Sequence, residues 1–217
     1  MVWQKIVDIS SPRYNNIKPN GAMIYSMLIR KFFIPNIKTD RNWITINTGE
    51  CYDHSIVFIH SNLNTDEKYY YLSEYKDLIL VSSQKSTQMH MRKYGRSIYL
   101  PLSIDTEYVK QFKRKKTKNA CYAGRADKIH SEKLKGIVGV DYVANLTHDS
   151  LLEKIAEYKD VYAVGLTALE ARCLGCRILP YDPRFPDASV WKVNDCRDMV
   201  KVLQEKLDRI EKTNMLK

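Results

Sequence analysis

The sequence predicts an α/β protein with two parallel-sheet units, and three observations lead to this prediction. Short apolar runs rich in Ile, Val and Phe, which are typical of strands, alternate with helical patterns along the chain. The alternation stops at a basic stretch, 110–118, where six of nine residues are Lys or Arg, and then starts again. The length of 217 residues, 44% of them hydrophobic, suits one large domain or two small ones with real cores.

The first half contains four predicted strands and two predicted helices. The strands are marked by β-branched and aromatic residues, and the second helix closes at Gly95. Tyr71 and Tyr75 lie four residues apart, as they would on one face of a helix. The predicted strands are 43–48, 55–62, 78–83 and 97–105, and the predicted helices are 66–75 and 84–95.

The second half repeats this organisation. Either Thr147 or Asp149 supplies a side-chain oxygen that can cap the first helix. The last helix is amphipathic, because its apolar residues are spaced for one face. That face consists of Met199, Val202, Leu203 and Leu207. The predicted strands are 119–124, 138–146, 160–164 and 177–182, and the predicted helices are 147–158, 166–174 and 196–210.

The basic stretch suggests the division into domains. It is too polar for a core element, so residues 113–118 are predicted to link an N-terminal domain, 1–112, to a C-terminal domain, 119–217, which ends in the last helix. The formal net charge of +10 favours an anionic partner such as nucleic acid, a phosphorylated small molecule or an anionic membrane or polymer surface. The alternative is that the charge serves only solubility.

Several classes of protein are not expected from this sequence. No apolar run approaches the 18 residues of a membrane span, and the first residues lack a signal-peptide pattern, so a cytoplasmic protein is expected. Five cysteines, an odd number, fit reduced thiols. Cys173 and Cys176 form a C-x-x-C pair without a second ligand pair, so no metal site is predicted.

The segment "VYAVGLTALEARCLGC", 161–176, is the candidate site. Gly165 lies between a strand and a helix, where free amides and the helix dipole favour a phosphate. Thr167 can add a hydroxyl, and Glu170 follows one turn later among apolar neighbours. A carboxylate in such a setting needs donors, which the hydroxyls of a ribose could supply. The alternative is a surface glutamate on an amphipathic helix.

The segment 165–179 resembles the donor-site signature of glycosyltransferase family 4, in the GT-B superfamily, which reads E-G-F-G-L-x-x-x-E-A-x-x-x-G-x-P-V. The matching residues are Gly165, Leu166, Glu170, Ala171 and Gly175. The resemblance implies two small Rossmann-like α/β domains facing a cleft. It also implies that Glu170 binds the nucleotide ribose, while Gly165, Leu166 and Thr167 hold the diphosphate.

The sequence departs from the signature at several positions, three of which bear on the site. Tyr162 stands where the family has its first glutamate, a residue that contacts the donor sugar. Ala163 replaces the first glycine, and Arg177 replaces the proline. Tyr162 can donate a hydrogen bond but cannot accept as a carboxylate does.

Other segments extend the resemblance. "CYAGRADKIHSEKLKG", 121–136, is similar to the family's G-R-then-K-G element, so Arg125 and a lysine, preferably Lys133, would clamp the donor phosphates. The usual spacing falls near His130, with Lys128 on its other side. His60 follows a strand and takes the place of the family's catalytic-site histidine, with a structural role as the alternative. Gly21 corresponds to the family's first glycine loop and would adjoin the sugar.

These expectations describe a metal-independent hexosyltransferase without a cofactor. It would move a sugar from UDP-hexose or GDP-hexose, with retention, to an acceptor that the positive charge suggests is anionic: DNA, a glycolipid or a wall polymer. Peripheral contact with a membrane is compatible with the same charge. Two alternatives stay open. One is a non-catalytic protein that binds a nucleotide or nucleotide sugar, and the other is a DNA-binding or DNA-glucosylating protein of viral type.

Overall fold

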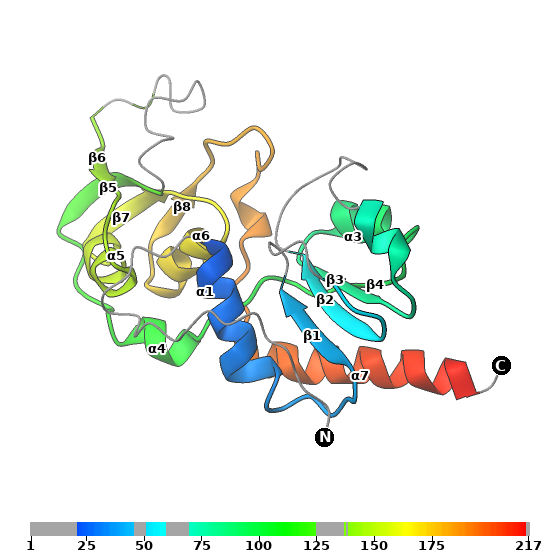
Figure 1. Cartoon of the computed structure of the whole chain (residues 1–217). Helices are drawn as coiled ribbons and strands as arrows, with labels where there is room; N and C mark the ends of the chain where they lie inside the picture. The colour runs from blue at the N-terminus through cyan, green and yellow to red at the C-terminus, as the bar shows by residue number, and fades with distance from the viewer. Residues whose placement is uncertain (1–20, 46–50, 60–69, 125–136, 138, 216–217) are drawn as a thin grey trace. The chain divides into compact units, whose positions relative to one another are not determined.

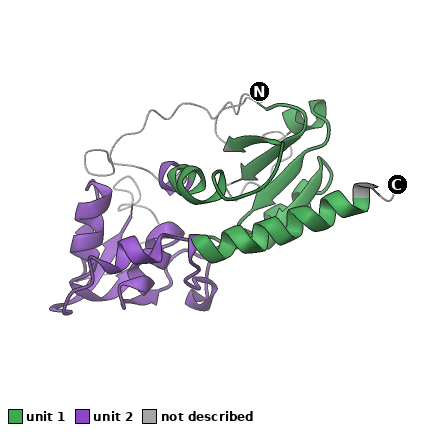
Figure 2. Ribbon diagram, turned by 90° about the horizontal axis from the view of Figure 1, so that it is seen from below, with its two compact units in different colours: residues 1–11, 26–102, 197–217 green, residues 12–25, 103–196 purple. Residues whose placement is uncertain are grey.

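The computed structural model describes residues 21–45, 51–59, 70–124, 137 and 139–215 (Figure 1). The chain forms two compact units, which are coloured separately in Figure 2. The described part of the first comprises Ser26–Leu102, with the gaps above, and residues 197–215. The described part of the second comprises residues 21–25 and Ser103–Cys196, with the gaps above.

The first unit contains a parallel sheet with the order β1-β2-β3-β4. Every residue of the two central strands is buried, which explains why they are apolar without alternation. Trp43 stacks on Phe58 of the neighbouring strand, with ring centroids 5.9 Å apart. The strands are β1 (Asn42–Thr45), β2 (Ser55–Ile59), β3 (Ile79–Ser82) and β4 (Arg96–Tyr99).

Helices and turns complete the first unit. Leu72 is fully buried in a 3₁₀ turn, η3 (Tyr70–Glu74), which is the described part of the helix predicted at 66–75. The π-turn η2 (Ile29–Phe33) continues α1 (Gly21–Leu28), a helix shared by both units. The helix α3 (Lys85–Met91) packs on β3 and β4.

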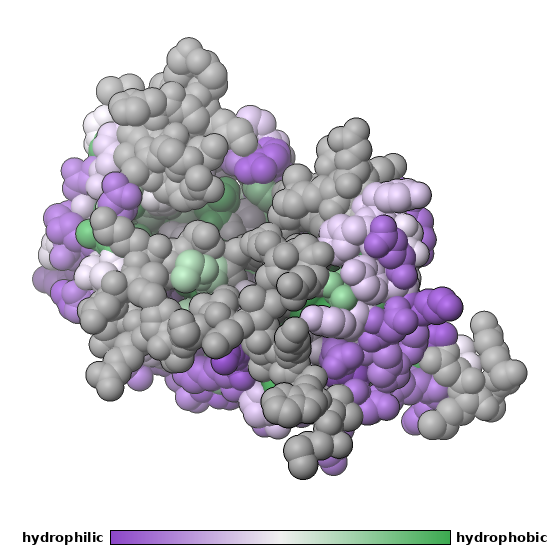
Figure 3. Space-filling model, viewed as in Figure 1, coloured by the Kyte–Doolittle hydropathy of each residue, from purple (hydrophilic) through white to green (hydrophobic). Residues whose placement is uncertain are grey.

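The long helix α7 (Cys196–Met215) belongs almost entirely to the first unit. Leu203 and Leu207 on its apolar face are fully buried, as the spacing predicted. Gln204 exchanges hydrogen bonds with the backbone of Lys38, and Lys206 donates to the carbonyl of Tyr99. On the face drawn in Figure 3, hydrophilic side chains cover much of the described part of α7.

The second unit contains a parallel sheet with the order β6-β5-β7-β8. Because β6 and β7 lie on opposite sides of β5, the chain reverses its winding direction between β5 and β7. In open α/β sheets this switch point, at the carboxyl ends of the strands, is where ligands bind. The strands are β5 (Lys118–Ala123), β6 (Asp141–Val143), β7 (Tyr158–Tyr162) and β8 (Arg177–Leu179), and the helices are α4 (Thr106–Lys110), α5 (His148–Ile155), α6 (Leu166–Cys173) and η6 (Ala188–Val190).

Two parallel sheets with helices confirm the predicted α/β class and its two Rossmann-like halves. The expected domain limits, 1–112, 113–118 and 119–217, remain a prediction, and the compact units divide the chain at other residues, after Leu102 and after Cys196. Residues 113–118 lie within the second unit, where Lys116 bonds the carbonyl of Ala156. None of the helices in the described ranges is long and apolar enough to cross a bilayer.

Candidate functional site

The turn between β7 and α6 lies at the switch point of the second sheet. Gly165 precedes the first residue of α6 with φ 67° and ψ −140°, a backbone conformation that essentially only glycine adopts. A Cβ built on Gly165 would meet no atom of the described residues within 4 Å. The first-turn amides of a helix lack partners within it, and this turn is therefore suited to an anion.

The predicted site residues are of two kinds, those that the structure describes and those that lie outside the described residues. One continuous segment, formed by β7, the turn and α6, carries Tyr162, Gly165, Leu166, Thr167 and Glu170. Tyr162 and Thr167 are half-buried, and Leu166 is buried. Gly21, the first residue of α1, is exposed and belongs to the same unit. The remaining three residues, His60, Arg125 and Lys133, lie outside the described residues.

Glu170 is buried, so the alternative of a surface glutamate on an amphipathic helix is wrong. Its side chain is 2% exposed, and its Oε1 lies 2.7 Å from Nε2 of His148. His148 is itself 3% exposed and is the first residue of α5. The donor that a carboxylate among apolar neighbours needs is therefore this imidazole.

The second carboxylate oxygen of Glu170 has a different environment. Oε2 is buried and has no hydrogen-bond partner within the part of the chain that the structure describes. A buried acceptor without a donor costs about 1–3 kcal/mol. The geometry thus presents one satisfied oxygen and one oxygen able to accept a hydrogen bond, a turn along the helix from Gly165.

Two helices hold His148 in place. Thr147 caps α5 by accepting a hydrogen bond from the Ser150 amide, as the sequence predicted for Thr147 or Asp149. The ring of Tyr108 on α4 stacks on the imidazole, with centroids 6.2 Å apart and planes 21° from parallel. The Tyr108 hydroxyl donates to Asp149. The imidazole is therefore fixed between Tyr108 and Glu170.

Electrostatics favour the protonated form of His148. Burial lowers the pKa of its imidazole, but the charge and hydrogen bond of Glu170, together with the charge of Asp149, outweigh burial and raise the pKa above its usual value. An imidazolium beside the carboxylate compensates its negative charge, one helical turn from Gly165. His148 was not among the site residues predicted from the sequence. A histidine directly after a helix cap, at the same sheet edge as Gly165, is the signal that could have identified it.

Much of the basic stretch pairs within the second unit. Lys116 Nζ donates to the carbonyl of Ala156 at 2.9 Å and lies 3.0 Å from Sγ of Cys176. Arg114 pairs with Glu153 on α5 at 3.3 Å, and Lys118 pairs with Glu157 at 2.9 Å. Lys113 and Lys115 of the same stretch are exposed. The stretch is therefore anchored by some of its side chains while others face solvent.

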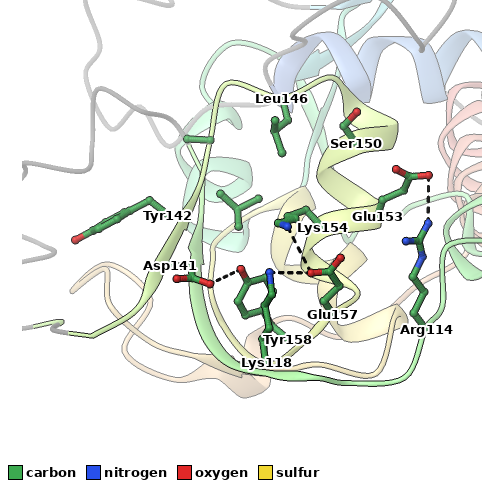
Figure 4. Close-up of a pocket in the computed structure, with 12 residues that line it drawn as sticks. Arg114, Lys118, Asp141, Tyr142, Leu146, Ser150, Glu153, Lys154, Glu157 and Tyr158 are labelled. Atoms are coloured by element: carbon green, nitrogen blue, oxygen red, sulfur yellow. Dashed lines mark hydrogen bonds and ion pairs between the residues drawn. The ribbon is translucent and has the colours of Figure 1, made fainter.

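A separate groove of about 750 Å³ is lined by residues of β5, β6, α5 and β7 (Figure 4). Its charged side chains satisfy one another: Glu157 bonds Lys118 and Lys154, and Asp141 accepts from the Tyr158 hydroxyl at 2.6 Å. Two of its lining residues, Arg114 and Lys118, belong to the basic stretch whose charge suggested an anionic acceptor. The charged groups of the groove are therefore paired with one another, whereas Glu170 Oε2 has no partner among the described residues.

The described residues contain no cluster of His, Cys, Asp and Glu suited to a metal ion. All five cysteines are free thiols, and burial raises the pKa of both Cys173 and Cys176. No protein-family model matches this sequence, and a comparison with curated proteins finds no significant match.

Proposed function

We propose that this protein is a glycosyltransferase that moves a hexose from a UDP-sugar or GDP-sugar to an acceptor. The observation that carries the proposal is the arrangement at the switch point: an open glycine turn with positive φ that starts a helix, and a buried carboxylate one turn later. The signature resemblance at Gly165, Leu166 and Glu170 supports the same assignment.

In this proposal the donor nucleotide binds in two parts. Its diphosphate lies against the amides of Gly165, Leu166 and Thr167, where the helix dipole stabilises negative charge. A ribose hydroxyl donates to Oε2 of Glu170, the oxygen that has no partner among the described residues. Arg125 and Lys133 are expected to add positive charge, and their roles stay predictions because they lie outside the described residues.

The proposed reaction breaks the bond between the anomeric carbon and the diphosphate and forms a bond from that carbon to an acceptor hydroxyl. The acceptor proton passes to the leaving phosphate, so no separate protein base is needed. Cations and amides that stabilise the charge of the leaving diphosphate lower the barrier. The resemblance implies retention of configuration, and it assigns the sugar contacts to His60, Tyr162 and Gly21.

The acceptor is proposed to be anionic. The net charge of +10 and the exposed Lys113 and Lys115 favour DNA, an anionic glycolipid or an anionic wall polymer. One observation favours a second function, a nucleotide-binding protein without turnover: Tyr162 stands where the related signature has the sugar-binding carboxylate.

The decisive experiment measures transfer and donor hydrolysis from labelled UDP-glucose and GDP-mannose. The acceptors are hydroxymethylated DNA, an anionic glycolipid and an anionic wall polymer. The parent should turn over one donor, Glu170→Gln should be much slower, and Glu153→Gln on the exposed part of α5 should match the parent. Binding without transfer or hydrolysis would favour the binding protein. If the parent neither binds nor turns over any of the donors, the proposal is contradicted.

A further inference from the structure

His148 lies next to the proposed nucleotide site and comes from a different helix. Its Nε2 is 2.7 Å from Oε1 of Glu170, and both side chains are at least 97% buried. The ring has little freedom, because Tyr108 stacks on its face and the Thr147 cap fixes the start of α5. A side chain held in this way can orient its neighbour, since buried hydrogen bonds determine the rotamer of a ligand-binding group.

The contact decides which carboxylate oxygen of Glu170 can serve a ligand. With Oε1 bonded to the imidazole, Oε2 is the acceptor that has no partner among the described residues. Without His148 the carboxylate would be buried without a donor, which is costly enough to favour rotation of the group. The single bond therefore keeps the Glu170 carboxylate turned in one direction.

We infer that His148 is a positioning residue of the nucleotide site, which holds Glu170 for a ribose hydroxyl and offsets its charge beside the diphosphate. The inference rests on the proposed function, because it assumes that Glu170 accepts from the nucleotide. In this proposal His148 itself contacts neither the sugar nor the phosphates. Its effect on the ligand passes through Glu170.

If His148 positions Glu170 through its charge, the affinity for the nucleotide depends on pH. The charged and titratable groups that act on the pair are Glu170 and Cys173 from α6, Asp149 from α5 and Tyr108 from α4, with Lys110 and Lys113 acting on Cys173. The pKa of His148 is raised in the folded protein, so the imidazolium persists at mildly acidic pH and is lost as pH rises through that pKa. Loss of this charge leaves the carboxylate uncompensated near an anion, and nucleotide affinity should fall.

The test compares calorimetric affinities for UDP-glucose and GDP-mannose at pH 6 and pH 9 in the parent and in three variants. These ligands carry a diphosphate esterified at both ends, whose charge stays constant over this range. His148→Gln keeps a donor near the Nε2 position but has no titratable charge. His54→Gln is the matched control, because His54 also bonds carboxylates but belongs to the first unit. His148→Ala removes both the donor and the charge.

The parent and His54→Gln should lose about 3- to 10-fold in affinity from pH 6 to pH 9, because the imidazolium of His148 is lost as the pH rises. His148→Gln should lose far less, and should approach the parent at pH 9. His148→Ala should bind more weakly at both pH values, with its folding checked by circular dichroism. Equal pH profiles for the parent and His148→Gln would overturn the inference while nucleotide binding stands. If the parent binds neither ligand, the proposed function fails and the inference fails with it.

Discussion

Two single residues make predictions that mutation can test: Gly165 through its backbone conformation and His54 through its charge. Gly165 adopts φ 67° and ψ −140°, where a Cβ is strained even though the space around it is open. Gly165→Ala should lower the free energy of unfolding by about 1–3 kcal/mol and should also abolish nucleotide binding. Gly139→Ala is the matched control, since Gly139 has φ 73° and the same open surroundings. A variant at Gly165 that binds nucleotide like the control would contradict the assigned role of this turn.

His54 is the second residue, and it predicts how the stability of the first unit changes with pH. Its Nδ1 and Nε2 lie 2.6 Å and 3.0 Å from Asp77 and Asp40. Hydrogen bonds to Asp77 and then Asp40 raise the pKa of His54, so its contribution is complete below the unfolded pKa and is lost as pH rises through the folded pKa. His54→Gln should cost about 0.5–1 kcal/mol at pH 6, because exposed pairs are screened, and almost nothing at pH 9. Urea unfolding at both pH values measures this difference, and an equal loss at pH 9 would show that the effect is not the charge.

Among the elements, α5 begins with a capping residue that lies directly before the site residue His148. Thr147 accepts a hydrogen bond from the Ser150 amide, and His148 follows it directly. Thr147→Ala should lower stability by about 0.5–2 kcal/mol and should also weaken nucleotide binding, because the cap fixes the position of His148. Asp187→Ala removes the cap of η6 in the same unit and should leave nucleotide affinity unchanged. If both variants bind nucleotide like the parent, the position of His148 does not depend on its cap.

Most elements of the fold could be predicted from local pattern. Apolar β-branched runs identify β2 and β3, and the period of the apolar residues identifies α7, since these patterns reflect burial on particular faces. The site could be predicted only in part, because Gly165 and Glu170 share one local segment. His148 lies 22 residues from Glu170 in the chain, so their contact is tertiary and has no local signature. The same holds for α7, which joins the first unit through contacts such as Gln204 to Lys38, 166 residues apart.

At the scale of the whole molecule, the net charge of +10 predicts binding to polyanions that depends on salt. Lys113, Arg114 and Lys115 are exposed, but Arg114 pairs with Glu153, and Lys116 bonds the carbonyl of Ala156. Replacing Lys113 and Lys115 with Gln should reduce the slope of log affinity against log salt for a DNA duplex by about 2, one for each lost phosphate contact. Lys201→Gln with Lys212→Gln, two exposed changes on α7, is the control of equal charge. Equal slopes for the two double variants would show that the basic stretch has no special role.

The proposed function requires that a nucleotide diphosphate binds at the start of α6 with its ribose on Glu170. Calorimetric titration of UDP-glucose and GDP-mannose into the parent and Glu170→Gln tests this most directly. Glutamine keeps the volume of the side chain but has only one oxygen. If that oxygen accepts from His148, the NH₂ group takes the Oε2 position, and if it takes the Oε2 position, the bond to His148 is lost. The parent should bind one of the two ligands. Glu170→Gln should bind the same ligand about 10- to 100-fold more weakly, because one hydrogen bond to a charged group is lost. Equal affinity of the two proteins, or no binding by the parent, would contradict the proposed function.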